Sequence, residues 1–204
     1  MRGSRRLSLE SLAVKTGHRL LLSGVGTGLD VPNLPAGARA VGLDLTPEML
    51  LRARHQARRC GKSVALVLGD AERLPFRSHA FDAAALHLIL AVVPHADAAL
   101  REAVRTVKPR GALAIFDKFL RAGETAGFLR SAADAVLRPL GTGLNTCFEA
   151  LLPGLPVTVE RDEPDLLGGA FRRIALRVLD SPDAVPPPPR DRRAARRRGA
   201  APRP

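Results

Sequence analysis

Short apolar runs, each bounded by glycine, proline or polar residues, recur along the first 116 residues of the chain. Runs of this length predict strands, and runs without alternation are typical of a parallel sheet with both faces covered. Residues 64–68 (VALVL) are the clearest example, so we expect both faces of that strand to be buried. The predicted strands are residues 19–23, 38–43, 64–68, 82–87 and 112–116.

A helix is predicted directly after the second strand. Thr46 offers a capping hydroxyl, Pro47 suits the first helical position, and Glu48 places an acid at the positive end of the helix dipole. We expect this helix to run to about Cys60 and to stop at Gly61.

Other helices are expected on either side of this region. Residues 7–16 predict a short helix before the first strand. Asp97 is expected to cap a helix whose apolar residues recur at i, i+3, i+4 and i+7, and residues 108–111 (KPRG) end it. Between the first two strands, Pro32 and Pro35 leave room for no more than a turn or two of helix.

The final third of the chain has a different pattern. Helical segments are expected around residues 125–138 and 144–152, and alternating runs follow at residues 157–161 and 171–178. No long helix separates these two runs, which predicts antiparallel neighbours. Together the elements predict an α/β fold: a Rossmann-like, doubly wound sheet of seven strands whose last two strands form an antiparallel edge.

A length of 204 residues suits one domain with tails. We expect a short N-terminal helical segment at residues 1–18, a domain at residues 19–180, and a disordered tail rich in proline and arginine at residues 181–204. No apolar run approaches the roughly 20 residues of a membrane span, and the basic N-terminus lacks the apolar core of a signal peptide. These features predict a cytoplasmic location.

The net charge of +12 at pH 7 raises the question of an anionic partner. Residues 181–204 hold seven arginines and two aspartates, but no aromatic residue for base stacking. We therefore expect no nucleic-acid partner, and peripheral contact with an anionic membrane stays open. Cys60 and Cys147 are too few and too far apart to predict a metal site. The sequence does not indicate an oligomeric state.

The most informative motif joins the first two strands. An apolar strand runs into Gly24, Gly26 and Gly28, where bare backbone allows a ligand to approach closely. Asp44 ends the second strand, where a carboxylate can accept hydrogen bonds from ribose hydroxyls. The dinucleotide fingerprint needs a glycine at position 29, where this chain has Leu29. The motif therefore predicts an adenosyl cofactor without a pyrophosphate.

Further motifs accompany the glycine loop in a consistent order: GVGTG (24–28), GLDLTPEML (42–50), GDAERLPF (69–76), FD (81–82), LRE (100–102) and VKPRG (107–111). With these motifs the chain resembles the class I S-adenosylmethionine-dependent methyltransferases. Within that family it is similar to the methyltransferase type 11 group, which includes ubiquinone/menaquinone-type and phosphatidylethanolamine N-methyltransferase-like enzymes. The match spans about residues 8–179.

The resemblance implies a binding site for S-adenosylmethionine. The glycines would make room for its methionine portion, Asp44 would accept the ribose hydroxyls, and Asp70 would accept the adenine amino group. Met49 would pack near the adenosine, and the backbone of Ala71 would contact the ring edge. The implied cofactor-binding residues are Gly24, Val25, Gly26, Thr27, Gly28, Asp44, Leu45, Met49, Asp70, Ala71 and His87.

Several of these residues have structural alternatives. Asp44 and Asp70 could cap helices instead, and Met49 could belong to the core. Asp82 is interpreted as structural, because it opens a buried strand and can fix a turn.

The chain also departs from the family pattern. Leu22 stands where the family has an acid, which removes one expected contact to the ammonium group of the cofactor, and Arg110 stands where a glycine is usual. Residues 1–18 are fewer than relatives place before the first strand, so they resemble a truncated lid.

Methyl transfer from a sulfonium is an in-line displacement that needs alignment more than acid–base help. His87 closes the fourth strand and could accept a proton near neutral pH, or could pack beside the methionine portion of the cofactor. Asp117 and Lys118 follow the fifth strand and could face the acceptor or form an ion pair. The candidate catalytic residues are therefore His87 and Asp117.

The methyl acceptor is less defined. Residues 88–93 (LILAVV), with Phe119 and Phe128, would suit an apolar acceptor or would serve as core. The resemblance implies methyl transfer to a small-molecule or lipid-like acceptor. The alternatives are a non-catalytic adenosyl-binding or RNA-associated protein and an NAD-dependent oxidoreductase, which Leu29 argues against.

Overall fold

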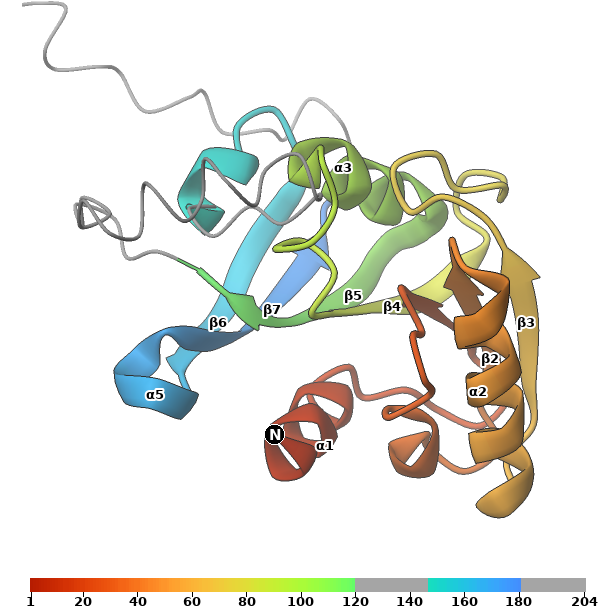
Figure 1. The fold of residues 1–204 in the computed structure, drawn as a ribbon. Coiled ribbons are helices and arrows are strands. Elements are labelled where there is room, and N and C mark those ends of the chain that lie inside the picture. Colours follow the sequence, from red (N-terminus) through yellow and green to blue (C-terminus); the bar gives the residue numbers. More distant parts are fainter. Residues whose placement is uncertain (120–146, 181–204) are drawn as a thin grey trace, which may run out of the picture.

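The fold is built on one seven-stranded sheet. The computed structural model describes residues 1–119 and 147–180 (Figure 1). The strands lie in the order β3-β2-β1-β4-β5-β7-β6; β7 is antiparallel to both β5 and β6, and the other neighbours are parallel. This confirms the predicted doubly wound sheet with an antiparallel edge. The strands are β1 (Arg19–Ser23), β2 (Arg39–Asp44), β3 (Val64–Leu68), β4 (Phe81–His87), β5 (Val107–Lys118), β6 (Val157–Pro164) and β7 (Phe171–Val178).

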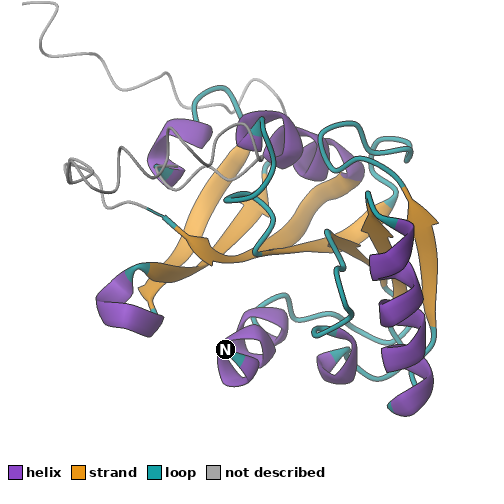
Figure 2. Cartoon of the chain, viewed as in Figure 1, coloured by secondary structure: helices purple, strands orange, loops and turns teal. Residues whose placement is uncertain are grey.

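Helices cover the two faces of the sheet (Figure 2). On one face, α1, η1 and α2 bury Leu9, Val31 and Ala53 against the sheet. On the other face, α3 and η3 bury Leu100 and Phe148. Each helix therefore contributes one apolar side to a core layer. The helices are α1 (Arg2–Glu10), η1 (Val31–Asn33), α2 (Pro47–Arg59), α3 (Ala96–Thr106), η3 (Phe148–Leu151) and α5 (Leu166–Gly169).

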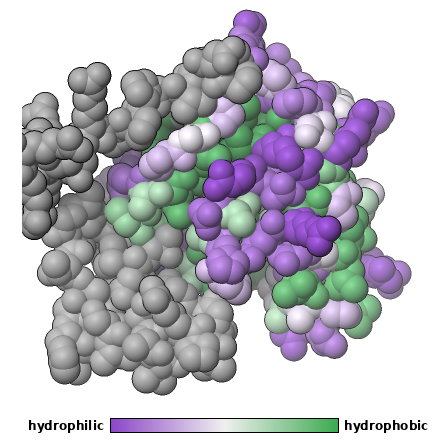
Figure 3. All heavy atoms as spheres, turned by 90° about the horizontal axis from the view of Figure 1, so that it is seen from above, coloured by the Kyte–Doolittle hydropathy of each residue, from purple (hydrophilic) through white to green (hydrophobic). Residues whose placement is uncertain are grey.

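The surface between these elements is mixed. Viewed from the side of α3, hydrophilic residues cover much of the described surface, and apolar residues form patches between them (Figure 3). None of the helices in the described part of the chain is long and apolar enough to cross a membrane; α2, with 13 residues, spans only about 20 Å.

Three predicted elements differ from the structure. The N-terminal helix lies at Arg2–Glu10 rather than at residues 7–16. β3 is not covered on both faces: it is an edge strand of the sheet, and Leu68 is 56% exposed. An apolar run alone does not show whether a strand is central or at an edge. β5 begins at Val107, so residues 108–111 end the helix but belong to the strand.

The helix boundaries agree more closely elsewhere. α2 begins at Pro47, and η1 is the single short turn that the two prolines allow. Asp97 lies in the first turn of α3, although the residue that precedes this helix is His95. The predicted segment at residues 125–138 lies outside the described residues, and within residues 144–152 the structure describes η3.

Asp82 has the structural role that the sequence indicated. Its carboxylate accepts hydrogen bonds from the backbone N–H of Arg19 (2.8 Å) and from the ammonium group of Lys108 (2.5 Å). These contacts tie together the starts of β1, β4 and β5. They lie at the amino ends of the parallel strands, opposite the ends where open α/β sheets bind ligands.

Candidate functional site

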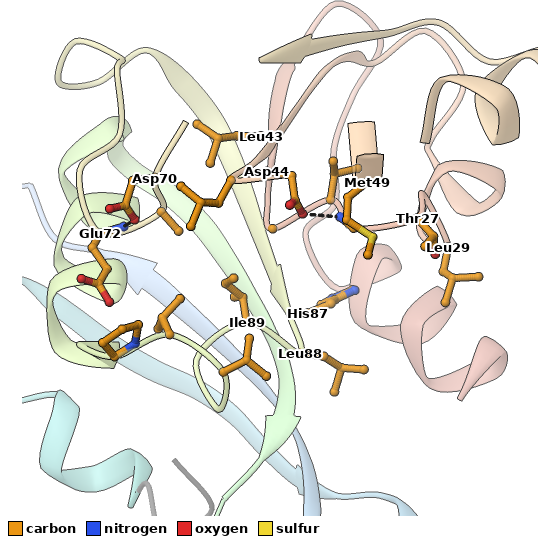
Figure 4. Close-up of a pocket in the computed structure, with 18 of the residues that line it drawn as sticks. Thr27, Leu29, Leu43, Asp44, Met49, Asp70, Glu72, His87, Leu88 and Ile89 are labelled. Atoms are coloured by element: carbon orange, nitrogen blue, oxygen red, sulfur yellow. Dashed lines mark hydrogen bonds between the residues drawn. The ribbon is translucent and has the colours of Figure 1, made fainter. Parts of the chain in front are cut away.

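A cavity of about 510 Å³ opens at the carboxyl ends of the parallel strands. This volume falls in the usual range for ligand pockets, about 300–1,000 Å³. Figure 4 places Asp70 and Glu72 on one side of the cavity and Thr27 and Leu29 on the other, with Asp44 and His87 between them. The lining residues are Arg5, Gly24, Val25, Gly26, Thr27, Leu29, Leu43, Asp44, Leu45, Met49, Asp70, Ala71, Glu72, His87, Leu88, Ile89, Val92, Val93 and Pro94.

The glycine loop after β1 forms part of the wall. Gly26 has a φ of +53°, and a Cβ there would meet no atom within 4 Å, so its backbone faces open space. Gly28 has a different reason to be glycine: a Cβ there would lie 2.9 Å from the Cα of Ala53 in α2. Gly28 does not line the cavity; it lets the loop pack closely against the helix.

Asp44 joins the glycine loop to the start of α2. Its Oδ2 accepts a hydrogen bond from the backbone N–H of Gly26 at 2.8 Å, and its Oδ1 accepts from the N–H (3.1 Å) and hydroxyl (2.8 Å) of Thr46. Thr46 therefore uses its hydroxyl on Asp44 and makes no side-chain hydrogen bond that caps α2. The carboxylate fixes the shape of the loop and still lines the cavity.

The loop after β3 contributes the acidic side of the cavity. Oδ1 of Asp70 accepts from the backbone N–H of Glu72 at 2.9 Å, which closes a tight turn around the buried Ala71. Glu72 in turn accepts from the backbone N–H of His95 at 2.6 Å and so connects this loop to the start of α3. Sequence reasoning missed Glu72, because its partner lies 23 residues away.

His87 ends β4 and is only 4% exposed. Its Nδ1 lies 2.8 Å from Oδ1 of Asp30, and its Nε2 lies 2.9 Å from the hydroxyl of Ser8. Oδ2 of Asp30 also accepts from Nη1 of Arg5 at 2.8 Å. Both ring nitrogens of His87 are therefore engaged within a buried polar cluster formed by Arg5, Ser8, Asp30 and His87, three members of which the sequence did not indicate.

The charges in this cluster determine the ionisation of Asp30. Burial raises the pKa of a carboxyl, but the hydrogen bonds and positive charges of His87 and Arg5 outweigh it, so the pKa of Asp30 lies below its ordinary value. Asp30 is therefore ionised at neutral pH and holds α1 against the end of β4.

Asp117 does not line the cavity. It is 1% exposed, and its carboxylate accepts from the backbone N–H of Ala91 (3.2 Å) and of Lys118 (2.7 Å). Burial raises its pKa to about 6. Lys118 contacts it through the backbone rather than as an ion pair, and Phe119 lies in the core. Phe128 lies outside the described residues.

Apolar side chains surround the mouth of the cavity. Leu29 is 51%, Leu45 69% and Val92 45% exposed, and all three line it. Leu88 also lines the cavity and has a φ of +58°, which is uncommon for a residue with a side chain. Sequence reasoning selected residues 88–93 as a whole, but Leu90 of that run is buried in the core.

Residues 21–115 match the family model described as "Methyltransferase domain". The chain is 36% identical over 112 residues to demethylmenaquinone methyltransferase of Corynebacterium kroppenstedtii, covering 54% of this chain and 46% of that protein. It is 28% identical over 157 residues to phosphatidylethanolamine N-methyltransferase of Cereibacter sphaeroides, covering 76% and 77%. The match with the first of these relatives thus spans about half of that protein's length.

The fold is also found among solved structures. A putative sarcosine dimethylglycine methyltransferase from Galdieria sulphuraria superposes with a TM-score of 0.72 at 15% identity, covering 88% of this chain and 85% of that chain. Agreement of the family model, the relatives and the fold confirms the resemblance that the motifs indicated. Over residues 21–115, the chain is similar to the methyltransferase domain that this family model describes.

Proposed function

We propose that this protein transfers a methyl group from S-adenosylmethionine to an acceptor with an apolar body. The observation that carries the proposal is one cavity that combines the open backbone of Gly26, the carboxylates of Asp44 and Asp70, and an apolar rim. The methyltransferase-domain match over residues 21–115 supports the same activity.

The polar groups of the cavity suit the adenosine part of the cofactor. A carboxylate offers about four acceptor positions, and three positions of Asp44 are already used by Gly26 and Thr46. Oδ2 keeps one position for a ribose hydroxyl, and the exposed hydroxyl of Thr46 can turn to water to free a second. Asp70 would accept from the adenine amino group beside the backbone of Ala71, and Met49 would pack against the adenosine.

The remaining residues of the proposed site would enclose the methionine portion. Gly24, Val25, Gly26 and Thr27 line the cavity at the glycine loop, and Leu45 lines it on the adenosine side. We assign Gly28 a supporting role, because it packs the loop against α2.

The chemistry requires alignment rather than a protein base. The cofactor supplies an electrophilic methyl group on its sulfonium, and the acceptor supplies the nucleophile in line with it. His87 has both ring nitrogens engaged by Asp30 and Ser8, so we propose that it positions the end of β4 instead of taking a proton. Asp117 would act similarly, by holding the backbone of the loop after β4.

The residues at the mouth of the cavity support a class of methyl acceptor. Leu29, Leu88, Ile89, Val92 and Val93 give the mouth an apolar lining. Covering the apolar surface of a ligand with an apolar wall favours binding by about 25 cal/mol for each Å² removed from water. The names of the relatives, demethylmenaquinone methyltransferase and phosphatidylethanolamine N-methyltransferase, support a quinone or a lipid headgroup as the acceptor class.

Binding is tested by calorimetry with S-adenosylmethionine, S-adenosylhomocysteine and NAD. We expect both sulfur ligands to bind and NAD not to bind. In the variant Asp44→Asn, the affinity for S-adenosylhomocysteine should fall by about 1–3 kcal/mol, because an acceptor for a ribose hydroxyl is replaced by a donor. Glu48→Gln is the matched control: Glu48 is exposed nearby on α2 and does not line the cavity.

Turnover is tested with radiolabelled S-adenosylmethionine. Demethylmenaquinone and phosphatidylethanolamine in detergent micelles serve as acceptors, and RNA serves as the alternative substrate. Labelled quinone or lipid would support the proposal. Binding of the sulfur ligands without labelling of any acceptor would instead identify a non-catalytic adenosyl-binding protein.

A further inference from the structure

Charge is distributed unevenly around the cavity. Three carboxylates line it on one side: that of Asp44 at the end of β2 and those of Asp70 and Glu72 in the loop after β3. Among the described residues that line the cavity, Arg5 of α1 is the single lysine or arginine. The cation therefore comes from the N-terminal helix, whereas the acids come from the end of β2 and the loop after β3.

The Arg5 guanidinium is buried but incompletely paired. Its side chain is 9% exposed, and Nη1 donates to Oδ2 of Asp30 at 2.8 Å. Nε is buried and has no hydrogen-bond partner among the residues that the structure describes. Arginine carries five N–H donors, and Asp30 is shared with His87. A buried cation with unpartnered donors is costly unless a further anion completes it.

The position of Arg5 indicates which anion would complete the pairing of its guanidinium. Asp30, which holds the guanidinium, follows Gly28 by two residues, so Arg5 lies beside the glycine loop. An S-adenosyl ligand whose adenosine meets the acids Asp44 and Asp70 extends its amino-acid end toward that loop. The carboxylate at this end is repelled by the acidic side of the cavity and attracted by the guanidinium.

We propose that Arg5 binds the carboxylate of the amino-acid portion of the S-adenosyl ligand, and this inference rests on the proposed function. Asp30 orients the guanidinium from behind, and the contacts of His87 with Asp30 and Ser8 fix α1 in place. The N-terminal helix is thereby part of the cofactor site.

A pair of ligands that differ only in the carboxylate tests this role. Calorimetry is performed with S-adenosylhomocysteine and with its decarboxylated analogue, for the wild type and for Arg5→Met. We expect Arg5→Met to lower the affinity for S-adenosylhomocysteine by about 10- to 100-fold, because the ligand loses a charge-assisted contact. The affinity for the decarboxylated analogue should change by less than about 3-fold, because it has no group for Arg5 to bind.

Arg6→Met is the matched control. Arg6 is the next residue on α1, is exposed, and pairs with Glu10 at 3.1 Å. Both ligands should bind this variant as they bind the wild type. If Arg5→Met does not fold, Arg5→Lys keeps a charge for Asp30 but lacks the planar fork that can hold two carboxylates. Arg5→Lys should likewise lower the affinity for S-adenosylhomocysteine more than the affinity for the decarboxylated analogue.

The other outcomes overturn the proposal in distinguishable ways. An equal loss of affinity for both ligands in Arg5→Met would show that Arg5 only supports the fold. Unchanged binding of both, with a raised KM for an anionic acceptor, would assign Arg5 to the acceptor instead. Failure of the wild type to bind either ligand would overturn the proposed function itself, and the role of Arg5 with it.

Discussion

Two buried aspartates, Asp30 and Asp117, have pKa values that are shifted in opposite directions. Asp30, just after the glycine loop, is 3% exposed, and Asp117, at the end of β5, is 1% exposed. The pKa of Asp30 lies below its ordinary value, whereas burial raises the pKa of Asp117 to about 6. Burial is nearly equal at the two sites, so it cannot explain the difference.

The hydrogen-bond and charge partners of the two aspartates explain the difference between their pKa values. Asp30 meets two side chains that carry or can carry positive charge, Arg5 from α1 and His87 from β4. Asp117 accepts hydrogen bonds from backbone N–H groups, and these, with the more distant charge of His87, do not offset its desolvation. A buried carboxylate is thus stabilised as an anion by cations from other elements, and Asp30 connects such elements while Asp117 shapes a loop.

The largest effect is expected from Asp30→Asn. This change removes the anion that compensates a buried guanidinium, and breaking a buried ion pair in this way costs about 3–5 kcal/mol. Urea denaturation at pH 7 measures the free energy of unfolding. Asp97→Asn is the control: Asp97 is exposed, pairs with Arg101 at 3.5 Å, and should change stability by less than about 1 kcal/mol. A loss of unfolding free energy in Asp30→Asn as small as that in the control would contradict the stabilising role of Asp30 in the cluster.

A pH-dependent effect of intermediate size is expected for Asp117. The folded protein holds the proton of Asp117 up to about pH 6, whereas the unfolded chain releases it near the ordinary pKa of 3.8. Stability from this group therefore falls as the pH rises between about 4 and 6, by up to about 3 kcal/mol. An asparagine side chain does not titrate, so the variant Asp117→Asn should gain that amount relative to the wild type between pH 4 and pH 7.

The same pH series separates the two aspartates. The pKa of Asp30 is lowered, so its stabilisation is present above its ordinary pKa and is lost only as the pH falls below about 4. Denaturation curves from pH 3 to pH 7 for both asparagine variants distinguish the two windows. A difference between wild type and Asp117→Asn that stays constant across this range would refute the raised pKa.

The smallest effect is expected from Ser8→Ala. The change removes the partner of His87 Nε2 and leaves that nitrogen buried, at a cost of about 1–2 kcal/mol. Ser63→Ala, outside the cluster, should lie within about 0.5 kcal/mol of the wild type. If both serine variants unfold at the same urea concentration, His87 does not depend on Ser8.

Much of the sheet could be predicted from the sequence. Apolar runs of strand length and a proline-initiated helix depend on neighbours in the chain, so β1, β2 and α2 were located within a residue or two. Gly26 and Asp44 could be selected because their spacing follows the βαβ unit, and Asp70 because the motif around it resembles that of a known family. The edge position of β3 could not be predicted, because it depends on which strands pair and not on the run itself.

The sequence by itself determined the order of elements, the glycine loop and the acids at the ends of β2 and β3. Only the tertiary structure decided that Gly28 packs on α2, that Asp117 does not line the cavity, and that Arg5 does. The physical reason is sequence distance: Ser8 and His87 are 79 residues apart, and their contact exists only because α1 packs beneath the sheet. Local periodicity carries no information about such a pair, whereas burial makes its hydrogen bonds obligatory.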